Sequence, residues 1–464
     1  MRQIGNRSGS WPYAVVLRLL FAVAGLSLLA ACGAPTVDRG VGPGQTAGQS
    51  DPTLPPVPPR PTGQPGSDTM PTGEQGLQRL PIPEDGTVRV ALLLPLSGGS
   101  ARLGRSMLSA AEMAMFEIAD EKFTLVPLDT MGTPDGAAAA AEKAIVEGAQ
   151  VILGPLLAHS VAAVKPLAQQ AGVQVVAFSN SRTVAGDGVF IMGFVPEQQV
   201  DAIVDFATGR GLSRYSVLAP EDPFGQTVVA ATQSAAEQRG ATLVRTQYYD
   251  PQASDFSNSV KALADYDERR KALLQQRAML QRQRDEVSRR ALKRLERRDT
   301  IGDVDFDAIL IPETGQRLRA LASLLPYFDV DPPAVRVLGL RDWDEIPRPQ
   351  AEPALVGAWY SAPDPGERDR FAERFRSSFG RPPARLASLA YDATALAAVL
   401  AQGESGPDFS FEALTNPNGF LGVDGLFRLN ATGVVERSLA ILEIAQDGVR
   451  VIQPARQSFQ EFTN

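Results

Sequence analysis

The sequence predicts an α/β fold made of two lobes, and three observations lead to this prediction. Strand-like and helix-like patterns alternate along the chain from residue 88 onward, as they do where parallel strands are joined by helical crossovers. The first strand, VRVALLL at 88–94, is almost continuously apolar, which is typical of a parallel strand buried on both faces. The alternation runs through two successive sets of elements, so we expect two similar lobes with parallel sheets.

Each set supplies its own strands and helices. In the first set, strands are expected at 88–94, 123–126, 151–153 and 173–178, and helices at 106–119, 136–147 and 161–170. In the second set, strands are expected at 216–219, 242–248, 307–311 and 335–340, and helices at 197–208, 227–239 and 316–327. Residues 365–402 are predicted to be mostly helical, and 425–452 to form a β-hairpin that turns at Asp447-Gly448.

The chain begins with a predicted lipoprotein signal peptide, at residues 1–31. Basic residues precede a short apolar run at 19–28, and small residues then lead to Cys32, the only cysteine. The run is too short for a comfortable membrane span. This pattern resembles a bacterial lipobox, in which the cysteine thiol is acylated and the cysteine becomes the mature N-terminus. The alternative is a stray cysteine beside an ordinary signal peptide.

Residues 32–87 comprise the lipidated cysteine and a predicted disordered linker. Proline and glycine recur there, as in PTLPPVPP at 52–59, and large apolar side chains are few. Such a segment cannot bury enough apolar surface to offset the entropy of ordering. We therefore expect it to hold the folded part, residues 88–464, away from the membrane to which the lipid binds.

Composition and motifs argue against several classes of function. The net charge of −8 argues against nucleic-acid binding, and one cysteine excludes an internal disulfide or a cysteine zinc site. The sequence has no HExxH, GxSxG, GxxxxGK[ST] or post-strand GxGxxG motif. A hydrolase would depend on the single histidine, His159, with the neighbouring Ser160. We therefore predict a non-enzymatic protein with no cofactor and no metal.

One segment, at about 265–299, interrupts the α/β pattern. Residues 268–298 contain twelve Lys or Arg and four Asp or Glu, with apolar residues at roughly helical spacing. This predicts a long basic amphipathic helix or a helical hairpin. It is either a solvated insertion that packs on its own lobe or a docking surface. A docking surface of this kind would suit an acidic partner, a membrane face or an anionic wall polymer.

Small polar residues follow three successive strands of the first lobe, at 97–100, 154–160 and 179–181. In open α/β sheets, ligands bind beyond the carboxyl ends of the strands. Backbone N–H groups, hydroxyls and helix N-termini at such a place favour a carboxylate or another anion. Turns and helix caps use the same residue types, but three such loops at one sheet edge predict a binding cleft.

The motifs RVALLLPLSG, ILGP, VVAFSNS, DPFG and AYDAT together resemble the type 1 periplasmic binding proteins of the leucine-binding kind, across 88–452. The resemblance implies two Rossmann-like lobes joined by three crossings, with a ligand cleft between them. The crossings are expected near 192–196, 361–367 and 412–422. Lobe 1 would then hold about 88–195 and 366–412, and lobe 2 about 196–361 and 422–456.

The resemblance also implies an amino-acid-like ligand and the residues that would bind it. The carboxylate would lie near Ser160, Ser179 and Ser181. Phe224 stands where a tyrosine is usual, Ile311 where another aromatic residue is expected, and Asp342 is nearest to the position of the ammonium partner. These departures weigh against tight amino-acid binding, because a buried site that lacks a hydrogen-bond partner for its ligand loses ~1–3 kcal/mol of binding free energy. The remaining candidates are Ser97 and the backbone near Leu157 and Asn180.

A closer resemblance is to the lipoprotein activators of penicillin-binding proteins. It rests on the lipobox, the linker, the charged insertion before 305–311, and the run GFLGVDGLFRLNATGVVERSLAILEI. It implies a periplasmic lipoprotein of the outer membrane that stimulates a bifunctional peptidoglycan synthase by direct contact. Gly33, rather than an aspartate, fits outer-membrane sorting over the inner membrane. The alternative is an amino-acid receptor that delivers its ligand to an ABC permease.

Overall fold

The computed structural model describes residues 86–283, 285–331, 334–403 and 406–460. The predicted signal peptide, Cys32 and nearly all of the linker lie outside the described residues. Within the described ranges, none of the helices combines the length and the apolar character needed to cross a bilayer.

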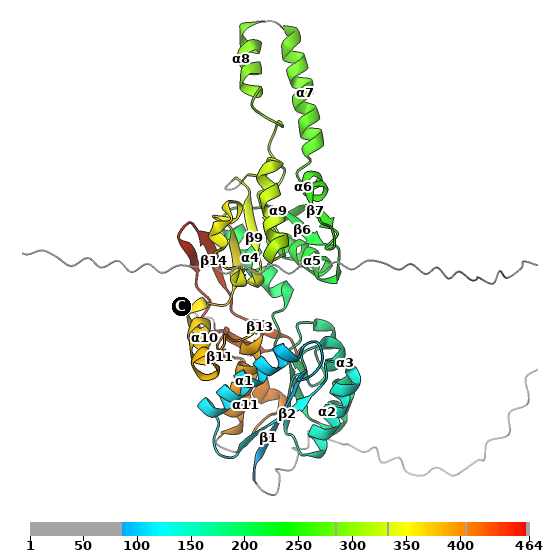
Figure 1. The fold of residues 1–464 in the computed structure, drawn as a ribbon, viewed down its shortest axis with the longest axis vertical. Helices are drawn as coiled ribbons and strands as arrows, with labels where there is room; N and C mark the ends of the chain where they lie inside the picture. The colour runs from blue at the N-terminus through cyan, green and yellow to red at the C-terminus, as the bar shows by residue number, and fades with distance from the viewer. Residues whose placement is uncertain (1–85, 284, 332–333, 404–405, 461–464) are drawn as a thin grey trace, which may run out of the picture. The chain divides into compact units, whose positions relative to one another are not determined.

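The first sheet has five parallel strands in the order β2-β1-β3-β4-β5. Helix α1 packs against α11 and α2 packs against α3, beside this sheet (Figure 1). Strand β1 is buried along most of its length, as its apolar run predicts. The strands are β1 (Val88–Leu94), β2 (Phe123–Asp129), β3 (Val151–Leu153), β4 (Gln174–Ala177) and β5 (Val189–Ile191), and the helices are α1 (Ala101–Ile118), α2 (Pro134–Val146), α3 (Ala158–Ala171) and α11 (Ala387–Ala401).

The second sheet has seven strands in the order β15-β14-β10-β9-β8-β6-β7, of which β6 to β10 are parallel and β14 and β15 antiparallel. The α/β class predicted from the sequence is therefore confirmed. The strands are β6 (Arg214–Pro220), β7 (Thr242–Tyr249), β8 (Ala308–Leu310), β9 (Arg336–Gly339), β10 (Trp359–Ala362), β14 (Ala440–Ala445) and β15 (Gly448–Gln453). The helices of this lobe are α4 (Pro196–Gly209), α5 (Pro223–Gln238), α6 (Ser257–Leu263) and α9 (Gly315–Tyr327). Among the described residues, short 3-10 helices occupy one loop between β4 and β5, at η1 (Arg182–Val184), and three positions between β9 and β10, at η2 (Arg341–Glu345), η3 (Pro349–Ala351) and η4 (Pro353–Leu355).

A third, three-stranded sheet shares the core of the first one. Its strands are β11 (Phe420–Gly422), β12 (Gly425–Leu429) and β13 (Val435–Arg437), and α12 (Phe411–Leu414) precedes it. Phe427, Leu429 and Val435 are buried in the same cluster as β1 to β5. Helix α10 (Pro365–Phe379) buries Phe371 and Phe375 against α1. We call 88–191 with 365–437 lobe 1, and 196–362 with 440–453 lobe 2.

The chain therefore passes between the lobes after β5, after β10 and after β13. The third crossing lies at residues 438–439, so its predicted place at 412–422 is wrong. The physical reason is that the apolar side chains of β12 and β13 pack on the lobe 1 core. The single hairpin predicted at 425–452 is also wrong: β12 pairs with β13 in one lobe and β14 with β15 in the other. The turn at Asp447-Gly448 does join β14 and β15.

The basic segment forms two helices, α7 (Tyr266–Gln283) and α8 (Glu286–Leu295), which lie side by side (Figure 1). They follow α6 in lobe 2 and return to the sheet at β8. Of the two sequence-based alternatives for this segment, the structure has the helical hairpin.

Candidate functional site

A cavity of about 300 Å³ lies between the lobes. The first lobe contributes loops that follow β1, β3 and β4, and the second lobe contributes the loops that follow β6 and β9. All of these loops lie at the carboxyl ends of parallel strands, where open α/β sheets bind ligands. The first crossing supplies its floor through Gly193, Phe194, Pro196 and the start of α4.

Five of the eight residues predicted to bind a ligand line this cavity. They are Leu157, Ser179, Asn180, Phe224 and Asp342.

The other three candidates, and Ile311, make local contacts instead. Ser160 is buried and its hydroxyl donates to the Thr133 carbonyl at 3.3 Å. The hydroxyl of Ser181 hydrogen-bonds that of Thr183 at 2.9 Å. The Ser97 backbone N–H donates to the Asp129 carboxylate, and this and similar bonds lower the Asp129 pKa although partial burial opposes them. Ile311, placed from the resemblance at an aromatic position, is fully buried in the lobe 2 core.

Local backbone geometry positions the cavity wall. A Cβ atom on Gly193 would lie 2.5 Å from the Ser179 carbonyl oxygen, so only glycine lets the first crossing pass so close to the loop after β4. On the opposite wall, the Asp222 side chain accepts from the Gly225 N–H at 2.8 Å and caps α5. This cap holds Phe224 in the first turn of α5, where it faces the cavity.

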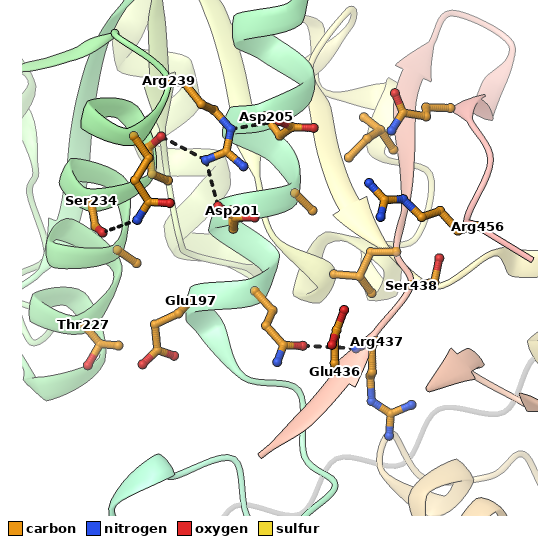
Figure 2. A pocket seen from close by; sticks show the side chains of 18 of the residues that line it. Glu197, Asp201, Asp205, Thr227, Ser234, Arg239, Glu436, Arg437, Ser438 and Arg456 are labelled. Carbon is orange, nitrogen blue, oxygen red and sulfur yellow. Dashed lines mark hydrogen bonds and ion pairs between the residues drawn. The ribbon is translucent and has the colours of Figure 1, made fainter. Parts of the chain in front are cut away.

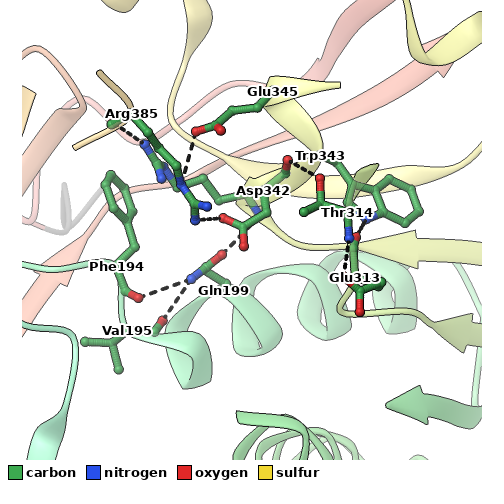
Figure 3. A network of polar contacts seen from close by, with 10 residues as sticks. Phe194, Val195, Gln199, Glu313, Thr314, Asp342, Trp343, Glu345 and Arg385 are labelled. Atoms are coloured by element: carbon green, nitrogen blue, oxygen red, sulfur yellow. Dashed lines mark hydrogen bonds and ion pairs between the residues drawn. The ribbon is translucent and has the colours of Figure 1, made fainter. Parts of the chain in front are cut away.

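An ion pair crosses the cavity mouth from one lobe to the other (Figure 3). Arg385 lies between α10 and α11 in lobe 1, and its guanidinium pairs with Asp342 and, at 3.1 Å, with Glu345 in lobe 2. Burial raises the pKa of Glu345, and Arg385 opposes that rise. The carboxylate of Asp342, expected from the resemblance to meet a ligand ammonium, thus meets a guanidinium of the chain itself.

Gln199, on α4, joins three elements at the floor of the cavity, and sequence reasoning missed it. Its side-chain oxygen accepts from the Arg341 N–H at 3.0 Å, and its backbone carbonyl accepts from the Ser361 hydroxyl at 2.8 Å. Its amide nitrogen faces the Phe194 carbonyl at 3.4 Å (Figure 3). The available signal was a glutamine within the otherwise apolar buried face of the predicted helix.

The lobe 2 wall beside Asp342 is held by a second set of hydrogen bonds. The Thr314 hydroxyl donates to the Asp342 carbonyl at 3.3 Å, and the Trp343 indole N–H donates to the Glu313 carbonyl at 2.9 Å. Buried Glu313 also accepts from the Tyr249 hydroxyl at 2.7 Å. These contacts fix the 3-10 helix that carries Asp342 (Figure 3).

Buried charges surround the crossings. Asp392 of α11 accepts from the Val423 N–H at 2.7 Å, and burial, together with the charge of Asp424, raises the pKa of Asp392 to about 7. Arg437, at the end of β13, donates to the Met192 carbonyl at 2.8 Å. Its guanidinium lies 4.7 Å from the Phe194 ring centroid. The last residue of β13, which directly precedes the third crossing, therefore contacts two residues of the first crossing.

A larger hollow, of about 800 Å³, lies between α4, α5 and the chain after β13 (Figure 2). Several of its charged groups form ion pairs with one another. Arg239 pairs with Asp201 and with Asp205 at 2.8 Å each, and Arg182 pairs with Glu197 at 3.7 Å. The acids that line this hollow are thus matched by bases of the chain itself, and none of the residues predicted to bind a ligand lies here.

The geometry does not support the hydrolase alternative. A ring nitrogen of His159 lies 3.3 Å from the Gly132 carbonyl, while the Ser160 hydroxyl faces the Thr133 carbonyl. The two side chains thus hydrogen-bond separate acceptors. Within the part of the chain that the structure describes, no group of three or more His, Cys, Asp or Glu is placed to hold a metal ion.

Comparison with known proteins gives a family match over part of the chain. Residues 87–276 match the family described as Periplasmic binding protein. An uncharacterized protein of Rickettsia prowazekii is 21% identical over 178 residues, which are 38% of this chain and 47% of that protein. The penicillin-binding protein activator LpoA of Mannheimia succiniciproducens is 30% identical over 167 residues, which are 35% of this chain and 28% of that protein. The matched part is less than half the length of either curated relative.

Solved structures share the fold over most of the chain. A putative branched-chain amino acid ABC transporter protein of Rhodospirillum rubrum has a TM-score of 0.61 and 17% identity, covering 79% of this chain and all of that one. A substrate-binding protein of Desulfitobacterium hafniense, in complex with leucine, has a TM-score of 0.54 and 17% identity, covering 79% of this chain and 100% of that one. The chain therefore has the fold of the type 1 periplasmic binding proteins, as the sequence resemblance predicts.

Proposed function

From this fold, we propose that the chain is a non-enzymatic periplasmic lipoprotein that regulates peptidoglycan synthesis by contact with a bifunctional synthase. The similarity to the penicillin-binding protein activator of Mannheimia succiniciproducens supports the proposal. So does the family match, because proteins of this fold act by binding. The lipid on Cys32 would anchor the protein to the outer membrane, with residues 33–87 as a tether.

The observation that carries the proposal is the ion pair between Arg385 and Asp342. A receptor for a free amino acid must offer a carboxylate to the ligand ammonium, because a buried charge without a partner is costly. Here Asp342 already has a cationic partner, and that partner comes from the opposite lobe. An ion pair between the two lobes hinders the entry of a ligand into the cleft. This favours a scaffold that binds another protein over a receptor that must admit a small ligand.

The second candidate is a leucine-type receptor of an ABC importer. The observation that favours it is the cavity of about 300 Å³ at the strand ends, lined by Ser179 and Asn180. This volume lies at the lower end of the range of small-molecule sites. In this alternative the protein would bind an amino-acid-like ligand and deliver it to a permease at the inner membrane.

Two measurements on the purified chain separate the candidates. We expect titration calorimetry with an amino-acid panel to give no heat of binding, and the chain to bind and stimulate the purified bifunctional synthase. Micromolar amino-acid binding together with no effect on the synthase would overturn the proposal in favour of the receptor.

A cavity-filling variant sharpens this comparison. Asn180 is exposed to the cavity, so Asn180→Trp would fill the space that a ligand needs. Asn258→Trp, at an exposed position on α6, is the matched control. We expect both variants to stimulate the synthase like the unsubstituted chain. Loss of activity in Asn180→Trp alone would show that the cavity is part of the function.

A further inference from the structure

Positive charge is concentrated in the helical hairpin α7–α8. Residues 268–298 hold twelve of the chain's 45 Lys and Arg, but only four of its 53 Asp and Glu. Since the whole chain carries a net charge of −8, the part of the chain outside the hairpin carries a larger net negative charge than the whole. An acidic partner is therefore attracted to the hairpin and repelled by the remainder of the surface.

Most of the basic side chains of the hairpin are available to a partner. The ion pairs within it use two acids: Glu268 pairs with Lys271 at 3.3 Å, and Glu286 pairs with Arg289 at 3.1 Å and with Arg290 at 3.3 Å. Six further basic residues are exposed and form no ion pair within the described part of the chain, namely Arg270, Arg282, Lys293, Arg294, Arg297 and Arg298.

The hairpin is held in a defined geometry before any partner arrives. Arg277 of α7 donates to the Leu295 carbonyl of α8 and, at 2.9 Å, to the Arg298 carbonyl. Asp285 caps α8 by accepting from the Ser288 N–H at 2.8 Å. Because these contacts order the backbone in advance, binding through the exposed side chains costs less conformational entropy.

The residue types favour a protein over a lipid surface. Ten of the twelve basic residues are arginine, and protein interfaces are enriched in Arg and Met and depleted in Lys. Met279 and Val287 are 60% and 74% exposed among the arginines. A helix that lies in a bilayer needs a continuous apolar face, whereas Leu292 and Leu295 of α8 are half-buried beside α7.

We infer that the hairpin α7–α8 is a docking surface for an acidic protein surface, whose carboxylates pair with its exposed arginines. The inference rests on the proposed function in naming the partner, which is then an acidic region of the bifunctional synthase. The docking surface itself is distinct from the cavity between the lobes, because the hairpin contributes no residue to that cavity.

Charge reversal in the full-length chain tests the inference. The hairpin variant is Arg282→Glu, Arg294→Glu and Arg297→Glu. The matched control, Arg102→Glu, Lys122→Glu and Arg319→Glu, changes the net charge equally at exposed positions outside the hairpin. We expect the hairpin variant to weaken binding to the purified synthase at least tenfold, and the control less than threefold. Circular dichroism and thermal melting confirm that both variants fold.

Two outcomes of this comparison would overturn the inference. Equal weakening by both variants would show that only total charge matters, and no weakening by either would show that the hairpin is not the contact. Binding to lipid is measured separately, by sedimentation of the same proteins with vesicles of phosphatidylglycerol and phosphatidylcholine. Binding to these vesicles that the hairpin variant alone abolishes, with unchanged synthase binding, would assign the surface to lipid instead.

A separate experiment distinguishes failure of the hairpin from failure of the proposed function. A photo-reactive amino acid replaces Met279 in the full-length chain, and adducts formed in cells are identified by mass spectrometry. A protein adduct that the charge reversal abolishes, with a partner other than the synthase, supports the docking surface while refuting the proposed partner. If irradiation yields no protein adduct at all, the inference fails whatever the synthase assay shows.

Discussion

Arg385 and Asp342 form an ion pair between residues that lie in different lobes. Arg385 precedes α11 in lobe 1, while Asp342 lies on the 3-10 helix that follows β9 in lobe 2. The same guanidinium pairs with Glu345 at 3.1 Å, so one cation of lobe 1 meets two carboxylates of lobe 2. The relative position of the lobes therefore depends on side-chain charge at the cavity mouth as well as on the three crossings.

Removing this cation should loosen the lobes with little effect on stability. Because the side chain of Arg385 is 42% exposed, we expect Arg385→Ala to reduce the free energy of unfolding by about 1 kcal/mol or less. The distances between spin labels at Glu142 in lobe 1 and Gln316 in lobe 2 should spread more widely in pulsed electron resonance. Arg370→Ala is the control, since Arg370 pairs with Glu367 on its own helix. An unchanged distance distribution would contradict a joining role for Arg385.

The alternation of strands and helices could be predicted from sequence because it is a local pattern. A strand buried on both faces must be apolar throughout, as Val88–Leu94 is. The third crossing could not be placed in this way. The apolar pattern of β12 and β13 is compatible with packing on either lobe. Only the tertiary structure assigns Phe427 and Val435 to the lobe 1 core.

The site was predictable in part for the same reason. The loops after β3 and β4 lie at the edge where parallel strands end, so Leu157, Ser179 and Asn180 could be expected at the cavity. The partner of Asp342 could not be expected, because Arg385 is 43 residues away and belongs to the other lobe. The buried acids Asp392 and Asp424 also resemble ordinary helix and turn residues in the sequence.

Replacement of Asp392 should change how stability depends on pH. The pKa of this carboxyl is about 7 in the fold, because burial and the charge of Asp424 disfavour ionisation while Arg437 favours it. In the unfolded chain its pKa is near 3.8. Between these values the folded state retains a proton that the unfolded state releases, so this group lowers the free energy of unfolding as pH rises from about 4 to 7.

The measurement is urea unfolding of the wild type and of Asp392→Asn between pH 4.5 and 7.5. The variant should become steadily more stable relative to the wild type as pH rises, since asparagine keeps an acceptor for the Val423 N–H and cannot ionise. Asp303→Asn removes a carboxylate at an exposed position and serves as the control. Parallel pH profiles for all three proteins would show that Asp392 does not titrate in this range.

Loss of the buried cation at Arg437 should be strongly destabilising. Arg437 is 7% exposed, and its charge is balanced by Asp424 and Asp392. Arg437→Ala removes the guanidinium with which both acids interact. We therefore expect a loss of about 3–5 kcal/mol in the free energy of unfolding. Asp424→Asn introduced into Arg437→Ala should recover part of that loss, because it removes one of the uncompensated charges. Strictly additive losses in the double variant would argue against this coupling.

Cys32 is predicted to attach the protein to the membrane, and its replacement tests both the anchor and the proposed location. Since Cys32 is the only cysteine, Cys32→Ala removes the only thiol that could be acylated. The variant should move from the membrane fraction to the soluble fraction and lose labelling by a palmitate analogue. Gly33→Asp is the informative companion, because it keeps the acylated cysteine and should shift the protein from the outer to the inner membrane on a sucrose gradient. Membrane retention of Cys32→Ala would mean that another part of the chain binds the membrane. It would contradict the proposal that residues 33–87 tether the two lobes to a lipid on Cys32.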